Sequence, residues 1–416
     1  MLANKATKEA ERANQEAQRA NAEWEIADWS MKRSTTLSQL SDARADSYQY
    51  VFGIDEKQSD LSAKFLEYLA NIDAVEKENN PSAYAAKRFV IGKHFLDRND
   101  YRRARDVLEP WVAEEYGNPE TLAYGQTLLG HVYVEFGMQV QALSLFKKAE
   151  QYYIGTPFEN TMEHTAMAIQ VALLSDDEKE TTRVVGMIDA LMESVTNQYN
   201  RSFLIGRIYK LQLKQGNFNA AYTALKQQVQ MVEAGALGKT ASLDTIFLNY
   251  ASMNIFYSNE LFLAKKNLDV AREITETRKG ESKSLGYIYE LEADLSWIEQ
   301  DYKVALPKNI LALELLEKYA GKSEHYVGVL AKQAVIQADT KNFDAAGLIL
   351  QELRALSEDV TGVWPELLEL YISARKEGIA SAQQITMDPG FPREKIEKKL
   401  VPGYFLKRLQ EDGLKL

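Results

Sequence analysis

A small residue recurs at nearly constant intervals along most of the chain, with apolar residues at helical spacing around it. Four residues after most copies comes a large apolar side chain, such as Leu108 or Phe146. Positions three and four apart share one face of a helix, so each small residue should lie on a buried helical stripe. The seven copies, between 38 and 43 residues apart, are Ala104, Ala142, Thr181, Ala221, Ala264, Ala305 and Ala346. The interval predicts seven helix hairpins.

We place each small residue early in the second helix of its hairpin, where a larger side chain would hold the two helices apart. The preceding turns are polar, as in Gly216-Asn217 and Lys341-Asn342, which suits one helix end followed by an N-cap. Pro110 and Pro307 fall inside predicted second helices and should bend them. The residues expected to begin second helices are Tyr101, Phe218, Leu261, Tyr302 and Phe343.

The best-formed copy carries a longer pattern, in which small and aromatic residues alternate between two helices. Its residues are Leu129, Gly130, Tyr133, Gly137, Ala142, Phe146, Ala149 and Pro157. This pattern resembles the tetratricopeptide repeat. The resemblance implies an all-α fold, a right-handed superhelical solenoid of about seven hairpins with a long N-terminal helix and C-terminal capping helices. It also implies protein binding, since proteins with such repeats use their concave face as a scaffold for partners.

The first 58 residues differ from the repeats and predict one long helix and a connector. Alanines step by three and four from Ala3 to Ala27, with Trp24 and Met31 continuing the row. An alanine seam buries little area, so three states stay open: a solvated helix, a helix packed on the first repeat, or a homodimer.

The same segment resembles the Ala/Glu/Arg-rich connectors of bacterial membrane-tethered signalling proteins. The resemblance rests on the runs at 9–13 and 16–20. It implies a regulatory domain in signal transduction, with a membrane tether upstream of Met1.

The hairpins are expected to form one solenoid over residues 59–390, closed by a capping helix that starts at Trp364. Residues 391–416 follow as a basic helix or tail, with seven Lys and Arg against four Asp and Glu. We expect a helix from about 393 to 410 that contacts either an acidic partner or the acidic body of the protein.

Composition removes several classes of function. The chain has no cysteine, which excludes disulfides and Cys-ligated zinc, and its net charge of −11 argues against direct nucleic-acid binding. No apolar run is long enough to cross a bilayer. Both a cytoplasmic protein and the extracytoplasmic part of a bacterial membrane protein fit this composition.

Recognisable catalytic patterns are missing from the sequence. The four histidines fall in different predicted helices without the spacing of a helical metal pair, and no serine lies in a Gly-x-Ser-x-Gly turn. We therefore expect no enzymatic activity, no metal and no cofactor.

The selective residues should lie on the first helices of the hairpins, beside the repeat pattern. The expected partner-binding residues are Tyr124, Thr127, His131, Lys210, Asn249, Met253, Glu290, Asp294 and Trp297. Their mixture of aromatic, amide and charged groups suits a partner peptide or helix. The alternative is a sensor that binds a small molecule or peptide and switches an attached kinase or transcription regulator.

Overall fold

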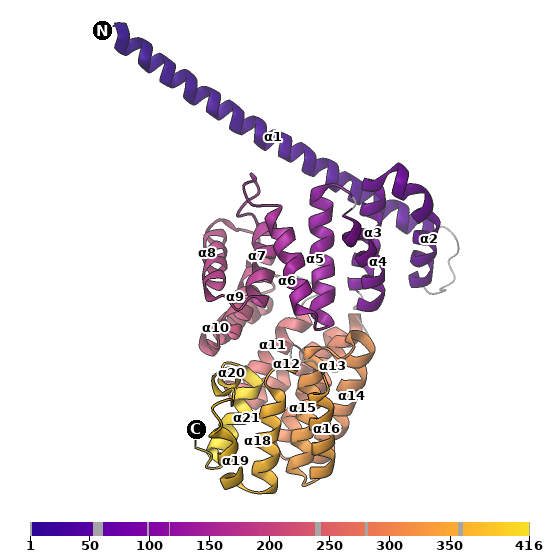
Figure 1. The fold of residues 1–416 in the computed structure, drawn as a ribbon, viewed down its shortest axis with the longest axis vertical. Helices are drawn as coiled ribbons and strands as arrows, with labels where there is room; N and C mark the ends of the chain where they lie inside the picture. The colour runs from indigo at the N-terminus through magenta and orange to yellow at the C-terminus, as the bar shows by residue number, and fades with distance from the viewer. Residues whose placement is uncertain are drawn as a thin grey trace. The chain divides into compact units, whose positions relative to one another are not determined.

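A computed structural model describes residues 2–52, 61–97, 100–115, 117–237, 243–278, 282–356 and 361–415. Every regular element in these ranges is a helix (Figure 1), as the hairpin pattern predicted. The connector expected up to residue 58 lies outside the described residues from 53 onward.

The helices follow one another with short turns. They are α1 (Leu2–Phe52), α2 (Leu61–Asn79), α3 (Pro81–Asp97), α4 (Tyr101–Glu114), α5 (Pro119–Glu135), α6 (Gln139–Gln151), α7 (Met162–Leu174), α8 (Glu178–Ser194), α9 (Gln198–Lys214), α10 (Phe218–Glu233), α11 (Leu243–Phe256), α12 (Leu261–Arg278), α13 (Lys283–Ile298), α14 (Tyr302–Ala320), α15 (Glu324–Asp339), α16 (Phe343–Arg354), α18 (Trp364–Lys376), α19 (Ile379–Thr386), α20 (Arg393–Glu397) and α21 (Leu400–Glu411).

The chain forms two compact units, each with its own packing. Unit 1 contains residues 1–132 and 144–168, and unit 2 contains residues 133–143 and 169–416. In unit 2, α9 packs on α10, α11 on α12, α13 on α14 and α15 on α16, and α10, α12 and α14 also contact the helix that follows. Each of these hairpins therefore packs against the next one along unit 2.

The seven small residues confirm the predicted register. Each is the fourth residue of its helix, α4, α6, α8, α10, α12, α14 or α16, and each is 3% exposed or less. All five predicted helix starts, from Tyr101 to Phe343, are observed. Pro110 and Pro307 lie within α4 and α14, which continue past them.

Two glycines show why the hairpins close tightly. A Cβ built on Gly92 of α3 would lie 2.4 Å from a Leu108 methyl carbon, and one on Gly130 of α5 would lie 2.8 Å from the Phe146 ring. Leu108 and Phe146 are the apolar residues four positions after the small residues of α4 and α6. The missing side chain on the first helix thus makes room for the large one on the second.

Helix α1 packs on unit 1 through one face of its later half (Figure 1). Trp29 contacts Tyr152 and Phe158 edge-on, and Arg33 forms an ion pair with Glu163 at 2.5 Å. The row that contains Trp24 faces away, since Trp24 is 68% exposed. Packing on the body is therefore observed for this half, and dimerisation through the alanine row remains a prediction.

The C-terminal region differs from the single helix expected over 393–410, because it forms α20 and α21 with a break at Lys398 and Lys399. Helix α21 buries Phe405, Leu406 and Leu409 in the core of unit 2. Its apolar face therefore packs against the protein's own body. None of the described helices is long and apolar enough to span a membrane.

Candidate functional site

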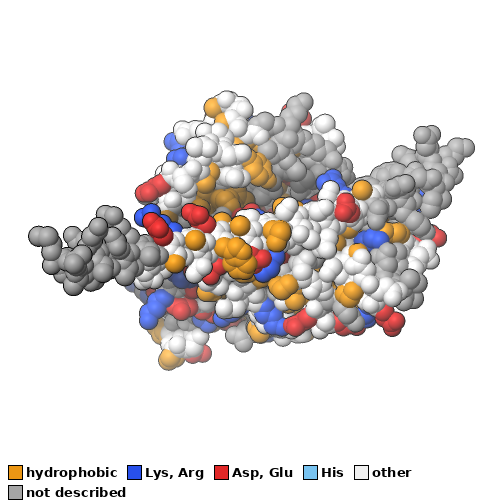
Figure 2. Space-filling view, turned by 90° about the horizontal axis from the view of Figure 1, so that it is seen from above, with side chains coloured by type: hydrophobic (Ala, Val, Ile, Leu, Met, Phe, Trp, Pro, Cys, Tyr) orange, Lys and Arg blue, Asp and Glu red, His pale blue; other side chains and the backbone are white. Residues whose placement is uncertain are grey.

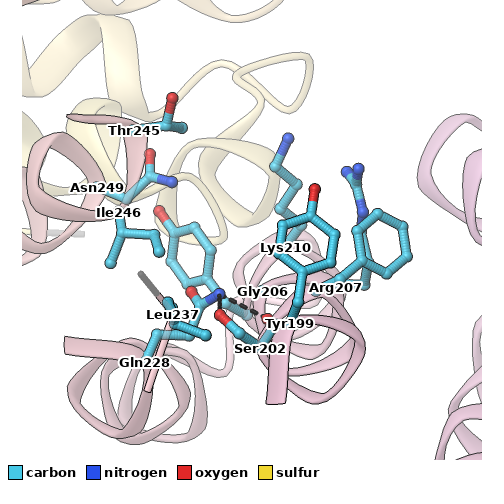
Figure 3. Close-up of a pocket in the computed structure, with 12 residues that line it drawn as sticks. Tyr199, Ser202, Gly206, Arg207, Lys210, Gln228, Leu237, Thr245, Ile246 and Asn249 are labelled. Atoms are coloured by element: carbon cyan, nitrogen blue, oxygen red, sulfur yellow. Dashed lines mark hydrogen bonds between the residues drawn. The ribbon is translucent and has the colours of Figure 1, made fainter. Parts of the chain in front are cut away.

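A hollow of about 180 Å³ opens in unit 2 beside α9, α10 and α11 (Figure 3). Helix α9 brings Tyr199, Phe203, Arg207 and Lys210, which are three or four residues apart and therefore share one face. Asn249 approaches from α11. The hollow combines aromatic walls with two cations and an amide, a set of groups typical of a binding site.

The two cations of the hollow have no anionic partner. Among the described residues, no carboxylate lies within ion-pair distance of Arg207 or Lys210, although the guanidinium of Arg207 lies over the Phe203 ring at 4.6 Å. In Figure 3 both side chains extend to the same side of α9. Two like charges on one helical turn repel each other, so a bound anion would stabilise both.

The pKa of Lys210 is lowered to about 8, and desolvation by the surrounding protein is the largest cause. Arg207 and Lys283 lower it further, and Glu135 opposes them. Lys283 is itself paired with Glu135, so that carboxylate is already engaged. Burial also lowers the pKa of Arg207.

The polar floor of the hollow is partly fixed. The side-chain amide of Gln228 donates to the carbonyl and hydroxyl oxygens of Ser202, at 2.6 and 3.2 Å. Asn249 and Thr245, by contrast, face the hollow from α11 (Figure 3). Their groups can donate and accept hydrogen bonds with a ligand's backbone.

The structure brings Lys210 and Asn249 together, as a shared binding face requires, but it closes four other predicted residues of unit 2. Met253 is fully buried, and Glu290, Asp294 and Trp297 are each 6% exposed or less. Met253, Asp294 and Trp297 are held by other parts of unit 2, and Glu290 lines a separate cavity of unit 2.

Glu290 and Asp294 belong to an ionic cluster between α13 and α15. Lys332 Nζ lies 2.7 Å from Glu290 Oε1 and 2.6 Å from Asp294 Oδ2, and His325 Nε2 contacts the other oxygen of Glu290. Burial is the largest cause that raises the pKa of Asp294, with Glu290 adding to it. Burial also acts to raise the pKa of Glu290, but His325 and Lys332 outweigh it and lower that pKa. The cluster fixes α13 against α15.

Trp297 is covered by the C-terminal helix. Its ring lies 4.9 Å from that of Phe405 on α21, and its Nε1 donates to Asp339 Oδ2 at 2.7 Å. Asp339 also accepts from the Tyr371 hydroxyl and pairs with Arg375. The sequence predicted that Trp297 offers an apolar contact to a partner. In the structure its ring instead contacts Phe405 of α21.

The three predicted residues of unit 1 also have internal partners. The Tyr124 hydroxyl donates to Glu120 at 3.0 Å, and Thr127 Oγ1 donates to the carbonyl oxygen of Ala123 at 2.8 Å. His131 lies edge-on to Phe146, with centroids 5.1 Å apart. Tyr124 and His131 keep partial exposure.

Sequence reasoning missed Tyr199, Phe203 and Arg207. Extending the face of Lys210 along α9 by steps of three and four reaches Arg207, Phe203 and Tyr199 in turn, so the signal was present in the spacing. The cover formed by α21 had no such signal, because it depends on contacts between residues far apart in the chain.

Within the described ranges, no group of three or more His, Asp or Glu side chains could hold a metal ion. Acidic and basic side chains are interspersed over the coloured residues of the face in Figure 2. That distribution differs from the clustered cations of a phosphate-tracking surface.

Comparison with known proteins gives little guidance. No family model matches the chain, and no curated protein matches its sequence. Among solved structures it is similar to the crystal structure of BtubC (BKLC) from P. vanneervenii, at 14% identity and a TM-score of 0.38, over 58% of this chain and 92% of that one. A likeness of this strength carries no argument about binding or activity.

Proposed function

We propose that this protein is an interaction module: a tetratricopeptide-like solenoid that captures a segment of a partner protein on the open face of α9 and α11. The observation that carries the proposal is the pair of cations, Arg207 and Lys210, which lie in a hollow beside aromatic side chains without a carboxylate partner among the described residues. A free protein gains nothing from such a pair, whereas a ligand with an acidic group gains from it.

The chemistry of the hollow favours a peptide over a metabolite. At about 180 Å³ the hollow holds only one or two side chains. An extended segment could place an acidic side chain against Arg207 and Lys210, an apolar one against Tyr199, and a backbone amide against Asn249. Specificity then comes from charge and aromatic contact together.

The test uses two fluorescein-labelled peptide libraries. In the first, each varied position holds Glu, Leu or Phe, and in the second, Gln replaces Glu. Fluorescence anisotropy should show saturable binding of the acidic library alone. The double variant Arg207→Gln/Lys210→Gln should weaken it by about 30-fold or more, since truncating one charge of a desolvated pair costs about 2–5 kcal/mol and each 1.4 kcal/mol is about tenfold.

Lys226→Gln is the matched control, because Lys226 is an exposed cation on α10 that does not line the hollow. It should bind like the wild type. Equal binding of both libraries, or an equal loss in the control, would contradict recognition through this hollow.

A sensor of small molecules remains the second candidate, and one observation favours it. A larger cavity, of about 850 Å³, lies elsewhere in unit 2 beside the C-terminal segment.

A further inference from the structure

The cavity of about 850 Å³ is distinct in its lining from the hollow of α9 and α11. Its walls come from the end of α9, from α15, from the start of α18 and from residues 390–402. Its volume falls in the range of about 300–1,000 Å³ that is typical of small-molecule sites.

Lysines from two parts of unit 2 converge on this cavity. Lys214 comes from the last turn of α9, and Lys395, Lys398 and Lys399 come from the C-terminal segment. The segment lies close to α9, because a Cβ on Gly216 would be 3.4 Å from the Cα of Lys398. A ligand in the cavity could therefore contact cations of both parts at once.

The charges of these lysines are only partly compensated. Lys399 Nζ lies 4.0 Å from Glu324, at the limit of an ion pair, and Lys398 pairs with Glu394 of its own segment. Lys395 has no carboxylate within ion-pair distance among the described residues. Lys214 Nζ donates to two carbonyl oxygens, those of Ala172 and Ser175, and burial lowers its pKa, an effect that Asp176 partly offsets.

Four carboxylates line the cavity: Glu290 and Glu324 have partners, and Asp176 and Glu366 are exposed. Glu290 is held on both oxygens by Lys332 and His325, and Glu324 accepts from Gln139 in addition to its contact with Lys399. Apolar surface is present as well, since Trp364 and Val401 line the same cavity. The site thus offers five lysines beside four carboxylates, next to apolar walls.

We infer that this cavity binds a small molecule with two or more negative charges, as carboxylates or phosphates, held between Lys214 of α9 and the lysines of the C-terminal segment. Such a ligand would neutralise cations that now face one another and would tie the segment to α9. The inference does not depend on the proposed peptide site, because the two pockets share no lining residue.

The experiment is isothermal titration of the full chain with pyrophosphate and, separately, with citrate at low ionic strength, paired with thermal-shift measurements. The wild type should bind at least one probe saturably, and the midpoint of unfolding should rise with probe concentration. Binding of pyrophosphate alone indicates a phosphate ligand, and binding of citrate alone indicates a carboxylate.

The variant Lys395→Gln/Lys399→Gln should weaken binding at least about tenfold, with an unchanged circular dichroism spectrum. Lys407→Gln is the matched control, because Lys407 is an exposed cation on α21 outside the cavity, and its affinity should stay within about twofold. The peptide-site variant Arg207→Gln/Lys210→Gln should bind the probe normally.

Three results overturn the inference: no saturable binding of either probe to the wild type, an equal loss in Lys407→Gln, or a loss in Arg207→Gln/Lys210→Gln. The last result would place the probe in the other hollow. If the wild type binds a probe but no peptide, the proposed function fails and this inference stands. If it binds peptide but neither probe, this inference fails and the proposed function stands.

Discussion

The first helices of unit 2 form an open region at α9 and α11 and a covered region at α13, α15 and α18. Among the described residues, Arg207 and Lys210 of the open region have no carboxylate within ion-pair distance, whereas in the covered region Lys332 holds two carboxylates. Helix α21 contacts both regions, with Phe405 on Trp297 and Trp364 and with Tyr404 on Phe256 of α11, so the two regions differ in their charge pairing. Repeated helices therefore do not imply repeated function: charges that are paired internally build the fold, and charges left unpaired are available to ligands.

The largest expected effect is in the covered region. Lys332→Met should lower the free energy of unfolding by about 3–5 kcal/mol, because it leaves Glu290 and Asp294 buried together without their shared cation. Urea denaturation measures the loss. Lys226→Met, at an exposed position, should stay within about 0.5 kcal/mol of the wild type.

The pH dependence of this variant gives a second check. Without Lys332 the pKa of Asp294 should rise further above its unfolded value, while Glu290 keeps His325 as a partner, so the folded state binds more protons. Stability should therefore improve as the pH falls from about 7 to 5, relative to the wild type. A loss of under about 1 kcal/mol at neutral pH would show that water reaches the cluster and that the two regions differ less than the structure indicates.

Much of the fold was predictable because a helix hairpin is encoded locally. The small residue, the apolar residue four positions later and the polar turn before it all lie within one hairpin, and together they fixed helix starts such as Phe218 and Tyr302. The break at Lys398 and Lys399 was not predictable in this way. Its position follows from how α21 packs on distant helices, which no local spacing records.

The candidate site was predictable to a smaller extent. The sequence predicted Lys210 and Asn249 for the binding face, and both line the same hollow. That this hollow binds a partner stays a prediction. Whether a face stays open depends on what covers it. Trp297 and Asp294 lie on covered helices only because Phe405 and its neighbours return over them from more than a hundred residues further along the chain.

A smaller effect is expected from removing one hydrogen bond in the covered region. Trp297→Phe keeps most of the ring packing on Phe405 and deletes the bond to Asp339, which retains Tyr371 and Arg375 as partners. The free energy of unfolding should fall by about 1–2 kcal/mol in urea titrations. Trp24→Phe, at an exposed position on α1, should change it by less than about 0.5 kcal/mol.

This variant also tests whether the two regions are independent. Binding of the acidic peptide library at α9 and α11 should be unchanged in Trp297→Phe under native conditions. A clear loss of affinity would show that the covered region controls binding at the open one. The two regions would then have to be described as coupled to each other.

The smallest effect concerns protonation of Lys210. Its pKa is lowered to about 8, mainly by desolvation and then by Arg207, from an ordinary value of 10.5. The folded protein therefore binds fewer protons at this site than the unfolded chain, so this contribution to stability rises as the pH increases from about 8 to 10. Binding has the opposite dependence, because an acidic ligand needs the charged form.

Affinity for the acidic peptide library should therefore fall several-fold between about pH 7 and pH 9 in anisotropy titrations, as Lys210 loses its proton. Lys210→Arg supplies the control: a guanidinium stays charged over this range, so its affinity should be nearly constant. If the arginine variant shows the same fall, another group titrates, and the lowered pKa of Lys210 does not govern binding. If neither protein shows a fall, the ligand's acidic group does not reach Lys210, and Arg207 alone would distinguish the open region from the covered one.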